Sequence, residues 1–291
     1  MTSGAQPFAV KLTERTHMVV ESATGRCLGA VGSNFYNAWV FPLYTPAGLT
    51  VVQEFPFDHP FHNGCYVRQH PVIVEGRIGN FWASPPRRGW DDHIFTHVGR
   101  VESPAAPQAE PHECGVRFTF RNIWRDENEQ PMIEEVRTID LRGTSDATIC
   151  DMISRKISAY GAAEYPQTKF GAIGIRVEPR LLPPLGGEIL ADAGRRGSAG
   201  VVHEKESDFV AYENVLPTGR RFGVLMHILE PKVRGPWFIR DYGMALFNPT
   251  WTRSISVLEG ESWTVGLRIV AYDDALTEAR AQAWLREADQ A

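Results

Sequence analysis

Three of the nine histidines in this 291-residue chain fall within the segment EFPFDHPFHNGCYVRQH, residues 54–70. His59, His62 and His70 share it with two carboxylates, two prolines and a glycine. A neutral imidazole can give or take a proton near neutral pH, and it is also a common ligand of metal ions. The segment therefore predicts a site that exchanges protons with a ligand or holds a metal.

A purely structural role for the same segment is the alternative. Asp58 and Asn63 are residues typical of turns, and they stand next to Pro60 and Gly64. In that case the histidines would only satisfy backbone carbonyl groups. Because Glu54 and other ionisable residues lie close by, we expect the cluster to be functional, since ionisable groups gather where chemistry takes place.

Three other segments carry polar side chains suited to the same site. The first, YPQTKFGAIGIRV, contains Lys169, and GWDDHIFTH contains Asp91, Asp92, His93 and His97. The third, GPWFIRDYGMALFNPTW, places Arg240, Asp241, Tyr242 and Asn248 among the aromatic residues Trp237, Phe247 and Trp251. Aromatic faces and polar groups together are typical of sugar-binding surfaces, although Arg240 and Asp241 would also fit a structural ion pair beside a buried Tyr242.

Composition excludes several classes of protein. The formal net charge is -5 and no run of Lys and Arg supplies the charge that nucleic-acid binding needs. No stretch of 18 apolar residues predicts a membrane span, and the first residues lack the apolar region of a secretory signal. The four cysteines form no CxxC pair, so we expect free thiols in a cytoplasmic protein.

Alternation of apolar and polar residues predicts antiparallel strands. Val116, Phe118 and Phe120 alternate with polar residues, as do the apolar residues of 147–157 and 263–269. Helical periodicity appears only near the C-terminus, where we expect a helix over about residues 273–289. The Pro/Ala-rich residues 103–111 read as a surface loop. The chain is thus predicted to be all-β, a single large antiparallel β-sandwich over residues 1–291 with a short C-terminal helix.

Five separated motifs resemble one bacterial family. In order they are DHPFHNGCYVRQH, GRIGNFW, FRNIWRDENEQPMIEEVRTIDL, TKFGAIGIRV and PWFIRDYGMALFNP, over about residues 54–272. In this order and spacing they resemble the family labelled "methane oxygenase PmoA". The resemblance implies a galactose-mutarotase-like β-supersandwich and a role in sugar catabolism.

The family pattern matches several candidate residues of this chain one by one. The matching positions are Asp58, His59, Pro60, His62, His70, Thr168, Lys169, Arg240, Asp241, Tyr242, Gly243 and Asn248. Four positions depart from the pattern: Phe61 and Phe238 stand where histidine is usual, Asn63 where arginine is usual and Phe170 where glutamate is usual. These departures put the family's substrate, its reaction and any metal site in question for this chain.

The favoured hypothesis is an enzyme that acts on a sugar or keto sugar by acid-base chemistry, as an epimerase or lyase does. His59 or His62 would shuttle the proton, Asp241 or Glu213 would act as the opposing base, and Lys169 and Arg240 would stabilise oxyanion charge. The ligand would also contact Asp58, His70, Trp82, Trp237, Tyr242 and Asn248. The expected partner is a small carbohydrate; no cofactor, no nucleic acid and no membrane is expected, and a homodimer is possible.

Two other hypotheses remain open from the sequence. The first is a metal-dependent hydrolase, lyase or oxygenase in which His59, His62 and a third ligand hold a divalent ion. The third ligand would be His97, or alternatively His70 or Asp241. The second is a sugar-binding protein without catalysis, for which the aromatic residues alone would suffice.

Overall fold

Strands form most of the chain in the computed structural model, which describes residues 6–56, 58–83 and 96–289. The strands are β1 Phe8–Thr13, β2 Thr16–Glu21, β3 Cys27–Ser33, β4 Ala38–Leu43, β5 Cys65–His70, β6 Val72–Val74, β7 Arg77–Gly79, β8 Arg100–Glu102, β9 Gln108–His112, β10 Gly115–Arg125, β11 Pro131–Gly143, β12 Ala147–Ile157, β13 Ala163–Tyr165, β14 Phe170–Arg176, β15 Glu188–Ala191, β16 Arg196–Gly197, β17 Val210–Val215, β18 Arg221–Glu230, β19 Trp237–Ile239, β20 Met244–Phe247, β21 Ile255–Val257 and β22 Ser262–Asp273. Short 3-10 helices lie at Pro179–Leu181, Pro183–Leu185 and Ala199–Val201, and the α-helix α1 spans Glu278–Asp289.

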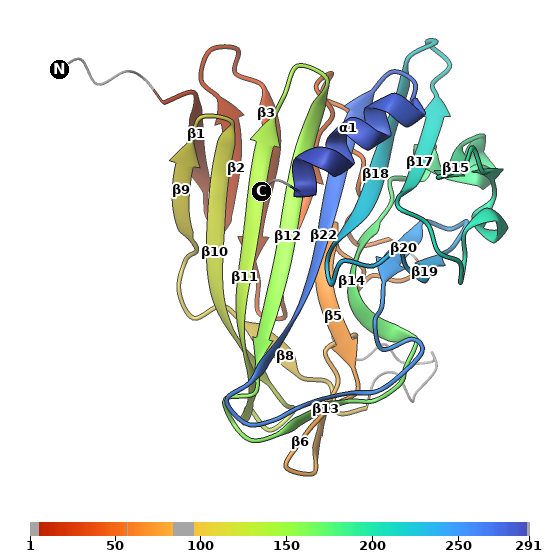
Figure 1. Ribbon diagram of the computed structural model, residues 1–291. Helices are drawn as coiled ribbons and strands as arrows, with labels where there is room; N and C mark the ends of the chain where they lie inside the picture. Colours follow the sequence, from red (N-terminus) through yellow and green to blue (C-terminus); the bar gives the residue numbers. More distant parts are fainter. Residues whose placement is uncertain (1–5, 57, 84–95, 290–291) are drawn as a thin grey trace.

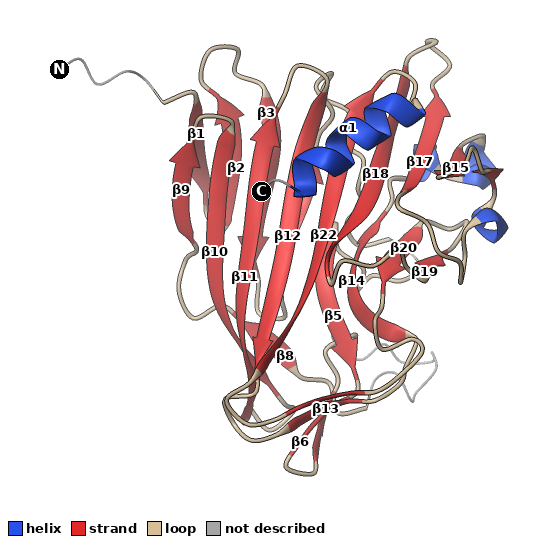
Figure 2. Cartoon of the chain, in the orientation of Figure 1, coloured by secondary structure: helices blue, strands red, loops and turns tan. Residues whose placement is uncertain are grey.

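Two large antiparallel sheets face each other (Figures 1 and 2). One has eight strands in the order β1-β2-β3-β4-β5-β14-β20-β19. The other has ten strands, with the order β16-β15-β17-β18-β22-β12-β11-β10-β8 and β9 also paired to β10. A smaller sheet, β21-β13-β6-β7, lies at one end. The predicted fold class, an all-β antiparallel sandwich with one C-terminal helix, is confirmed.

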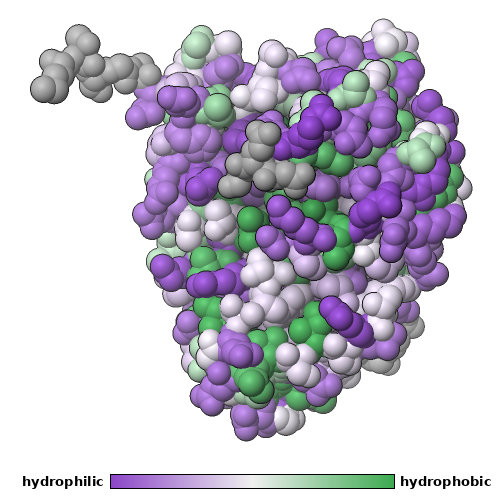
Figure 3. Space-filling model, viewed as in Figure 1, coloured by the Kyte–Doolittle hydropathy of each residue, from purple (hydrophilic) through white to green (hydrophobic). Residues whose placement is uncertain are grey.

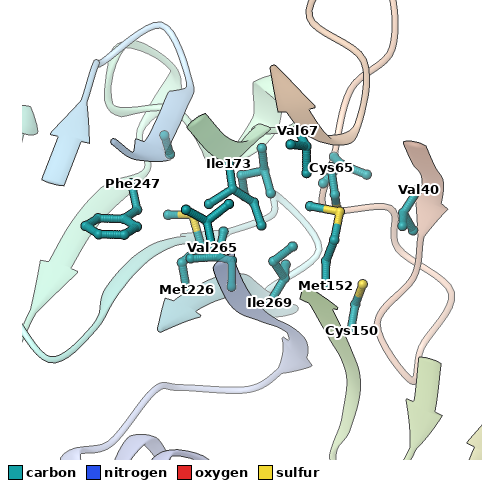
Figure 4. Packing of buried hydrophobic residues seen from close by; sticks show 14 of the residues in the cluster. Val40, Cys65, Val67, Cys150, Met152, Ile173, Met226, Phe247, Val265 and Ile269 are labelled. Atoms are coloured by element: carbon teal, nitrogen blue, oxygen red, sulfur yellow. The ribbon is translucent and has the colours of Figure 1, made fainter. Parts of the chain in front are cut away.

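The hydrophobic core lies between the two large sheets. Cys65, Val67 and Ile173 from the eight-stranded sheet meet Met152 and Ile269 from the ten-stranded sheet (Figure 4). Residues from Phe8 to Ala271 contribute to this one cluster. The core is therefore built from strands spread over most of the chain, from β1 to β22.

Periodicity predicted the long strands correctly but not always the face that enters the core. In β22, Val265, Leu267 and Ile269 are buried between the sheets, as their alternation indicates. In β12, Ile153 is only half-buried, and the alternate set that includes Met152 and Lys156 points inward instead. A strand pattern with apolar residues on both faces does not by itself identify the inner one.

Two predicted boundaries are wrong. Gln108–His112, within the predicted loop, is strand β9, which pairs with β10 along one side; Pro111 is tolerated there because an edge strand leaves some backbone groups unpaired. The helix begins at Glu278 instead of near residue 273, because β22 continues to Asp273 and the Thr277 hydroxyl accepts the backbone N–H of Arg280 as an N-cap.

Helix α1 covers the outer face of the ten-stranded sheet across β12, β22 and β18 (Figure 1). Trp284 and Leu285 pack there against Ile149 and Val270. Around the helix, this face carries mostly hydrophilic side chains with smaller apolar patches between them (Figure 3). Among the described residues, no helix has the length and apolar character needed to cross a membrane.

Candidate functional site

A pocket lies on the outer face of the eight-stranded sheet, where β5, β14, β20 and β19 run side by side. Its volume is about 220 Å³. The described residues that line it are His59, Phe61, His62, Trp82, Lys169, Phe170, Phe238, Arg240, Tyr242 and Met244. The structure thus brings together six of the predicted site residues: His59, His62, Trp82, Lys169, Arg240 and Tyr242.

Strand alternation decides which side chains reach the pocket. On β19, Trp237 points into the core between the sheets, and its neighbour Phe238 therefore points outward. On β20, Phe247 faces the core and Met244 faces the pocket. The apolar floor of the pocket is the outer face of strands whose inner face forms the core.

The loop between β4 and β5 brings the two histidines over this floor. The backbone N–H of His62 donates to the carbonyl oxygen of His59 at 2.9 Å, which closes a tight turn. Gly64 follows with φ of +52°, and a Cβ at this position would lie 2.0 Å from the carbonyl oxygen of Val40. Glycine is therefore required where the loop joins β5, because the chain passes directly against β4.

Four aromatic rings form a column, and three of them, from Tyr242, His59 and His62, line the pocket. The ring of His59 lies between those of Tyr242 and His62, with centroids 5.3 and 4.8 Å away and interplanar angles of 6° and 4°. The ring of Tyr66 continues the column, 5.8 Å from His62 at 12°. Because each imidazole is held between flat neighbours, both rings have a fixed orientation toward the ligand space.

Asp58 fixes the tautomer of His59. Its Oδ2 lies 2.8 Å from Nδ1 of His59, and both of its oxygens accept from Nη2 of Arg176 at 2.7 and 2.8 Å. Burial raises the pKa of Asp58, but the hydrogen bonds from Arg176 and His59 outweigh this effect and hold the pKa below its usual range. An ionised carboxylate accepts only, so Nδ1 of His59 carries a proton and donates it to Asp58.

The hydrogen-bond roles of the two ring nitrogens are reversed in His62. Nη1 of Arg176 lies 3.4 Å from Nδ1 of His62, and a guanidinium only donates, so Nδ1 accepts and the proton lies on Nε2. The side chain is fully buried, and burial is the main cause that lowers its pKa well below 6.5; the nearby guanidinium of Arg176 acts in the same direction. His62 is thus a neutral imidazole whose Nε2–H has no hydrogen-bond partner within the described chain.

Tyr66 adds a second buried polar group at the base of the column. Its hydroxyl has no hydrogen-bond partner in the part of the chain that the structure describes, and burial raises the pKa of the phenol. The phenol is therefore neutral. An unsatisfied buried donor next to His62 marks a place where a ligand or water oxygen would be stabilised.

Two cations stand at the pocket without a carboxylate partner among the described residues. Nζ of Lys169 lies 5.1 Å from the ring centre of Phe170. Arg240 packs its guanidinium over Phe238 at 4.3 Å and donates from Nη1 to Nε2 of His203 at 2.6 Å. The pocket is therefore positively charged at the side formed by these residues.

Asn248 positions the segment that carries Lys169 instead of contacting a ligand. Its Nδ2 donates to the carbonyl oxygen of Thr168 at 2.7 Å, and its Oδ1 accepts from the hydroxyl of Thr250 at 2.7 Å. Nε2 of Gln69 on β5 donates to the same hydroxyl. This buried network ties the residue before Lys169 to two strands of the sheet.

Several predicted site residues lie elsewhere. Trp237 is in the core, where its Nε1 donates to the carbonyl oxygen of Ser207, so its assignment to the ligand surface is wrong. Oδ1 of Asp241 accepts the backbone N–H of Ala199, and Asp241 does not line the pocket. His70, at the end of β5, packs its ring 5.8 Å from that of Phe170, outside the lining.

Glu213 cannot serve as the opposing base. It lies on β17 of the other sheet, where its carboxylate binds Arg221 and the backbone N–H of Leu276. A carboxylate used to anchor the start of the C-terminal segment faces the ten-stranded sheet, not the pocket.

The alternative metal set is not assembled. Nδ1 of His97 lies 2.8 Å from Glu127 in an exposed pair, and His97 does not line the pocket with His59 and His62. Among the described residues, no group of three or more His, Cys, Asp or Glu side chains could hold a metal ion. Asp91, Asp92 and His93 lie outside the described residues.

Sequence reasoning missed Arg176, Tyr66 and His203. Arg176 ends the otherwise apolar strand β14, and a single arginine at the end of such a strand was the available signal. Tyr66 lies within the histidine segment itself, on the outer face of β5. His203 lies on a loop far from every motif, and nothing in its surroundings pointed to Arg240.

Comparison with known proteins gives a family and weak structural likenesses. No curated protein matches the chain significantly. A galactose 1-epimerase from Lactobacillus acidophilus NCFM is 10% identical with a TM-score of 0.47, covering 93% of this chain and 100% of that one. A putative aldose 1-epimerase from Escherichia coli K12 is 10% identical with a TM-score of 0.37, covering 92% and 99%.

A galactose mutarotase-like protein from Lactobacillus casei ATCC 334 is 5% identical with a TM-score of 0.37, covering 91% and 100%. With TM-scores below 0.5, none of these likenesses bears on the chemistry of the pocket. The resemblance to the family labelled PmoA stays a prediction. The model of a family of unknown function, DUF6807, matches residues 32–286, so the chain belongs to that family.

Proposed function

We propose that the protein is an enzyme that moves a proton on a carbon next to a carbonyl group of a single-ring carbohydrate. The observation that carries the proposal is that two imidazoles with different hydrogen-bond roles line one pocket: Nδ1 of His59 donates to Asp58, and Nδ1 of His62 accepts from Arg176, so that Nε2 of His62 carries the N–H. In the proposed reaction, Nε2 of His59 is the proton acceptor. The reaction is of the epimerase or lyase type.

His59 is the general base in this proposal. The C–H bond next to the carbonyl breaks, the proton passes to Nε2 of His59, and the electron pair moves to the carbonyl oxygen, forming an enolate. The imidazolium that forms lies beside the ionised carboxylate of Asp58, 2.8 Å from Nδ1. Delivery of a proton from water to the opposite face gives an epimer, after which His59 loses its proton to solvent. In an elimination, the enolate electron pair forms the new double bond as the substituent on the next carbon leaves, and the His59 imidazolium gives its proton to that leaving group.

His62 stabilises the enolate. A neutral imidazole can donate Nε2–H to a developing oxyanion without carrying a charge of its own that would bind the ground state equally well. The stacked arrangement holds this donor in place before the ligand arrives, because the ring of His62 packs parallel to those of His59 and Tyr66. The two histidines of the turn thus have separate roles.

The shape and lining of the pocket support a carbohydrate of one ring. A volume of about 220 Å³ lies below the roughly 300–1,000 Å³ typical of sites for drug-sized ligands. Trp82, Phe170 and Phe238 offer aromatic surface for the apolar face of a sugar ring. The polar groups named above would then contact its hydroxyl and carbonyl oxygens.

Hydrogen-deuterium exchange at carbon tests the proposal directly. The purified protein is incubated in D₂O with monosaccharides, their keto derivatives and their uronic acids, and deuterium incorporation is followed by NMR and mass spectrometry. In His59→Gln, which keeps a polar side chain but removes the base, we expect exchange to slow by about 10²–10⁴-fold. In His62→Leu, which removes the donor, we expect a loss of about 10²–10³-fold.

A matched control is His112→Gln. His112 lies on β9 and pairs with Asp140 of β11, in the ten-stranded sheet. The pocket lies on the other large sheet, so the loss of this imidazole should leave the exchange rate unchanged. Ligand binding by the wild-type protein without exchange in any compound would refute the enzymatic proposal and favour a sugar-binding protein. Equal losses in His112→Gln and His59→Gln would assign the effect to general destabilisation.

A further inference from the structure

The charge of the pocket points to a more specific ligand class, on the basis of the proposed function. We propose that the carbohydrate carries a carboxylate group, as a uronic or other sugar acid does, and that Lys169 and Arg240 bind this carboxylate. Under this proposal the two cations recognise a fixed charge of the ligand, and His62 alone serves the developing oxyanion.

The described lining contains cations but no carboxylate. Lys169 and Arg240 both line the pocket, and Arg176 lies immediately behind the histidines. The nearby carboxylate of Asp58 already accepts two hydrogen bonds from Arg176 and one contact from His59. Asp58 is therefore engaged by Arg176 and His59, and Lys169 and Arg240 have no carboxylate partner among the described residues, which leaves positive charge for a ligand to neutralise.

Arg240 is held so that part of its guanidinium stays available. Nη1 donates to His203, and the plane packs over Phe238. Burial, followed by the charge of Arg240, lowers the pKa of His203, so this imidazole is neutral and accepts without neutralising the cation. Glu204 approaches the same imidazole nitrogen at 3.6 Å but does not line the pocket. A guanidinium has five N–H groups, so donors remain for a planar carboxylate.

Lys169 is exposed, and its backbone is fixed where it meets the pocket. The Asn248 side chain holds the carbonyl of Thr168, and Phe170 begins β14 next in the chain. The ammonium therefore starts from a defined position beside the aromatic ring. Its partner in the described structure is that ring alone, which does not neutralise its charge.

A carboxylate fits the proposed chemistry. Removing a proton next to a carbonyl group adds negative charge to the ligand, and a ligand that is already an anion would resist this step. Cations bound to the existing carboxylate offset that repulsion. A volume of about 220 Å³ leaves less room for the larger phosphate group beside a sugar ring than for a planar carboxylate.

The test compares binding of matched acids and neutral sugars to the full chain. D-glucuronate and D-galacturonate are titrated against D-glucose, D-galactose, the methyl ester of glucuronate and glucose 6-phosphate, by calorimetry and by fluorescence of Trp82 and the other tryptophans. We expect the free acids to bind at least about tenfold more tightly than the neutral sugars and the ester. Added salt should weaken acid binding and leave sugar binding unchanged.

Substitutions at the two cations locate the carboxylate. Lys169→Gln and Arg240→Gln should each weaken acid binding about tenfold or more, and the double variant should no longer discriminate acid from ester. Lys11→Gln removes one positive charge on β1, outside the pocket lining, and should leave affinities unchanged. Folding of each variant is checked by its melting temperature.

Each outcome separates this inference from the proposed function. Neutral sugars that bind as tightly as the acids, acids that do not bind, tighter binding of the sugar phosphate, or discrimination that survives in the double variant would each overturn the carboxylate assignment. Acid binding with the expected loss in the variants, but without deuterium exchange at carbon, would support the carboxylate site and refute only the proton-transfer reaction.

Discussion

Replacing His62 with glutamine should change how the stability of the protein depends on pH. The side chain is fully buried, and burial, together with the positive charges around it, lowers its pKa well below the ordinary 6.5. As the pH falls through 6.5, His62 of the unfolded chain takes up a proton while His62 of the folded chain does not. The unfolded state then binds more protons, so the free energy of unfolding decreases as the pH falls.

The magnitude follows from this single proton. Below pH 6.5 and above the lowered pKa of the folded state, one histidine makes the free energy of unfolding fall by about 1.4 kcal/mol for each pH unit. Total stabilities of about 5–15 kcal/mol are usual, so the loss is measurable within one unit. Glutamine does not titrate, and the slope of stability against pH should decrease by this amount in His62→Gln.

Urea unfolding followed by tryptophan fluorescence, between about pH 5 and pH 7.5, measures the slope for both proteins. His17 and His203, whose pKa values are also lowered by burial, contribute to the slope in both, so the difference isolates His62. Phe61→Leu is the matched control: its ring lies 4.9 Å from that of His62, and its loss should lower stability equally at every pH. An unchanged slope in His62→Gln would refute the neutral, buried imidazole on which its role as a donor depends.

Three other substitutions test the surrounding structure. Lys156→Met should raise the free energy of unfolding at pH 7 by about 1–3 kcal/mol, because Nζ of this fully buried lysine has no hydrogen-bond partner among the described residues and burial lowers its pKa to about 7. The wild-type protein, but not the variant, should gain stability from pH 7 to 10.5, because the lysine of the unfolded chain keeps its proton over this range; urea unfolding would show the difference. Arg176→Met removes the guanidinium whose Nη2 donates to both oxygens of the half-exposed Asp58. The free energy of unfolding, measured by chemical denaturation, should fall by about 1–3 kcal/mol. The pKa of the Asp58 carboxyl should rise, and an unaltered NMR titration would contradict the pairing. Gly64→Ala should lower the melting temperature strongly, since its Cβ would lie 2.0 Å from the Val40 carbonyl oxygen. Gly48→Ala is the control: Gly48 also has a positive φ, but no atom lies within 4 Å of the added Cβ, so this variant shows the cost of the backbone conformation alone.

The sequence alone determined the fold class and much of the site. Alternating apolar residues identify strands such as β10 and β22, because a strand exposes its two faces at alternate positions. The turn residues around His59 and His62 keep both histidines in one loop whatever the tertiary structure. Lys169, Arg240 and Tyr242 were recognisable because polar groups interrupt apolar strand segments.

The tertiary structure decided which of these residues meet. Arg176 binds Asp58 from 118 positions away, and only the pairing of β5 with β14 brings them together. Neighbouring residues on a strand point to opposite faces of the sheet, so Trp237 enters the core while Phe238 lines the pocket. The same alternation buries Lys156, which pairs across β11 and β12 with Glu135. A strand pattern fixes alternation, but the inner face and the neighbouring strand follow from how the sheets stack, which depends on residues distant in the chain.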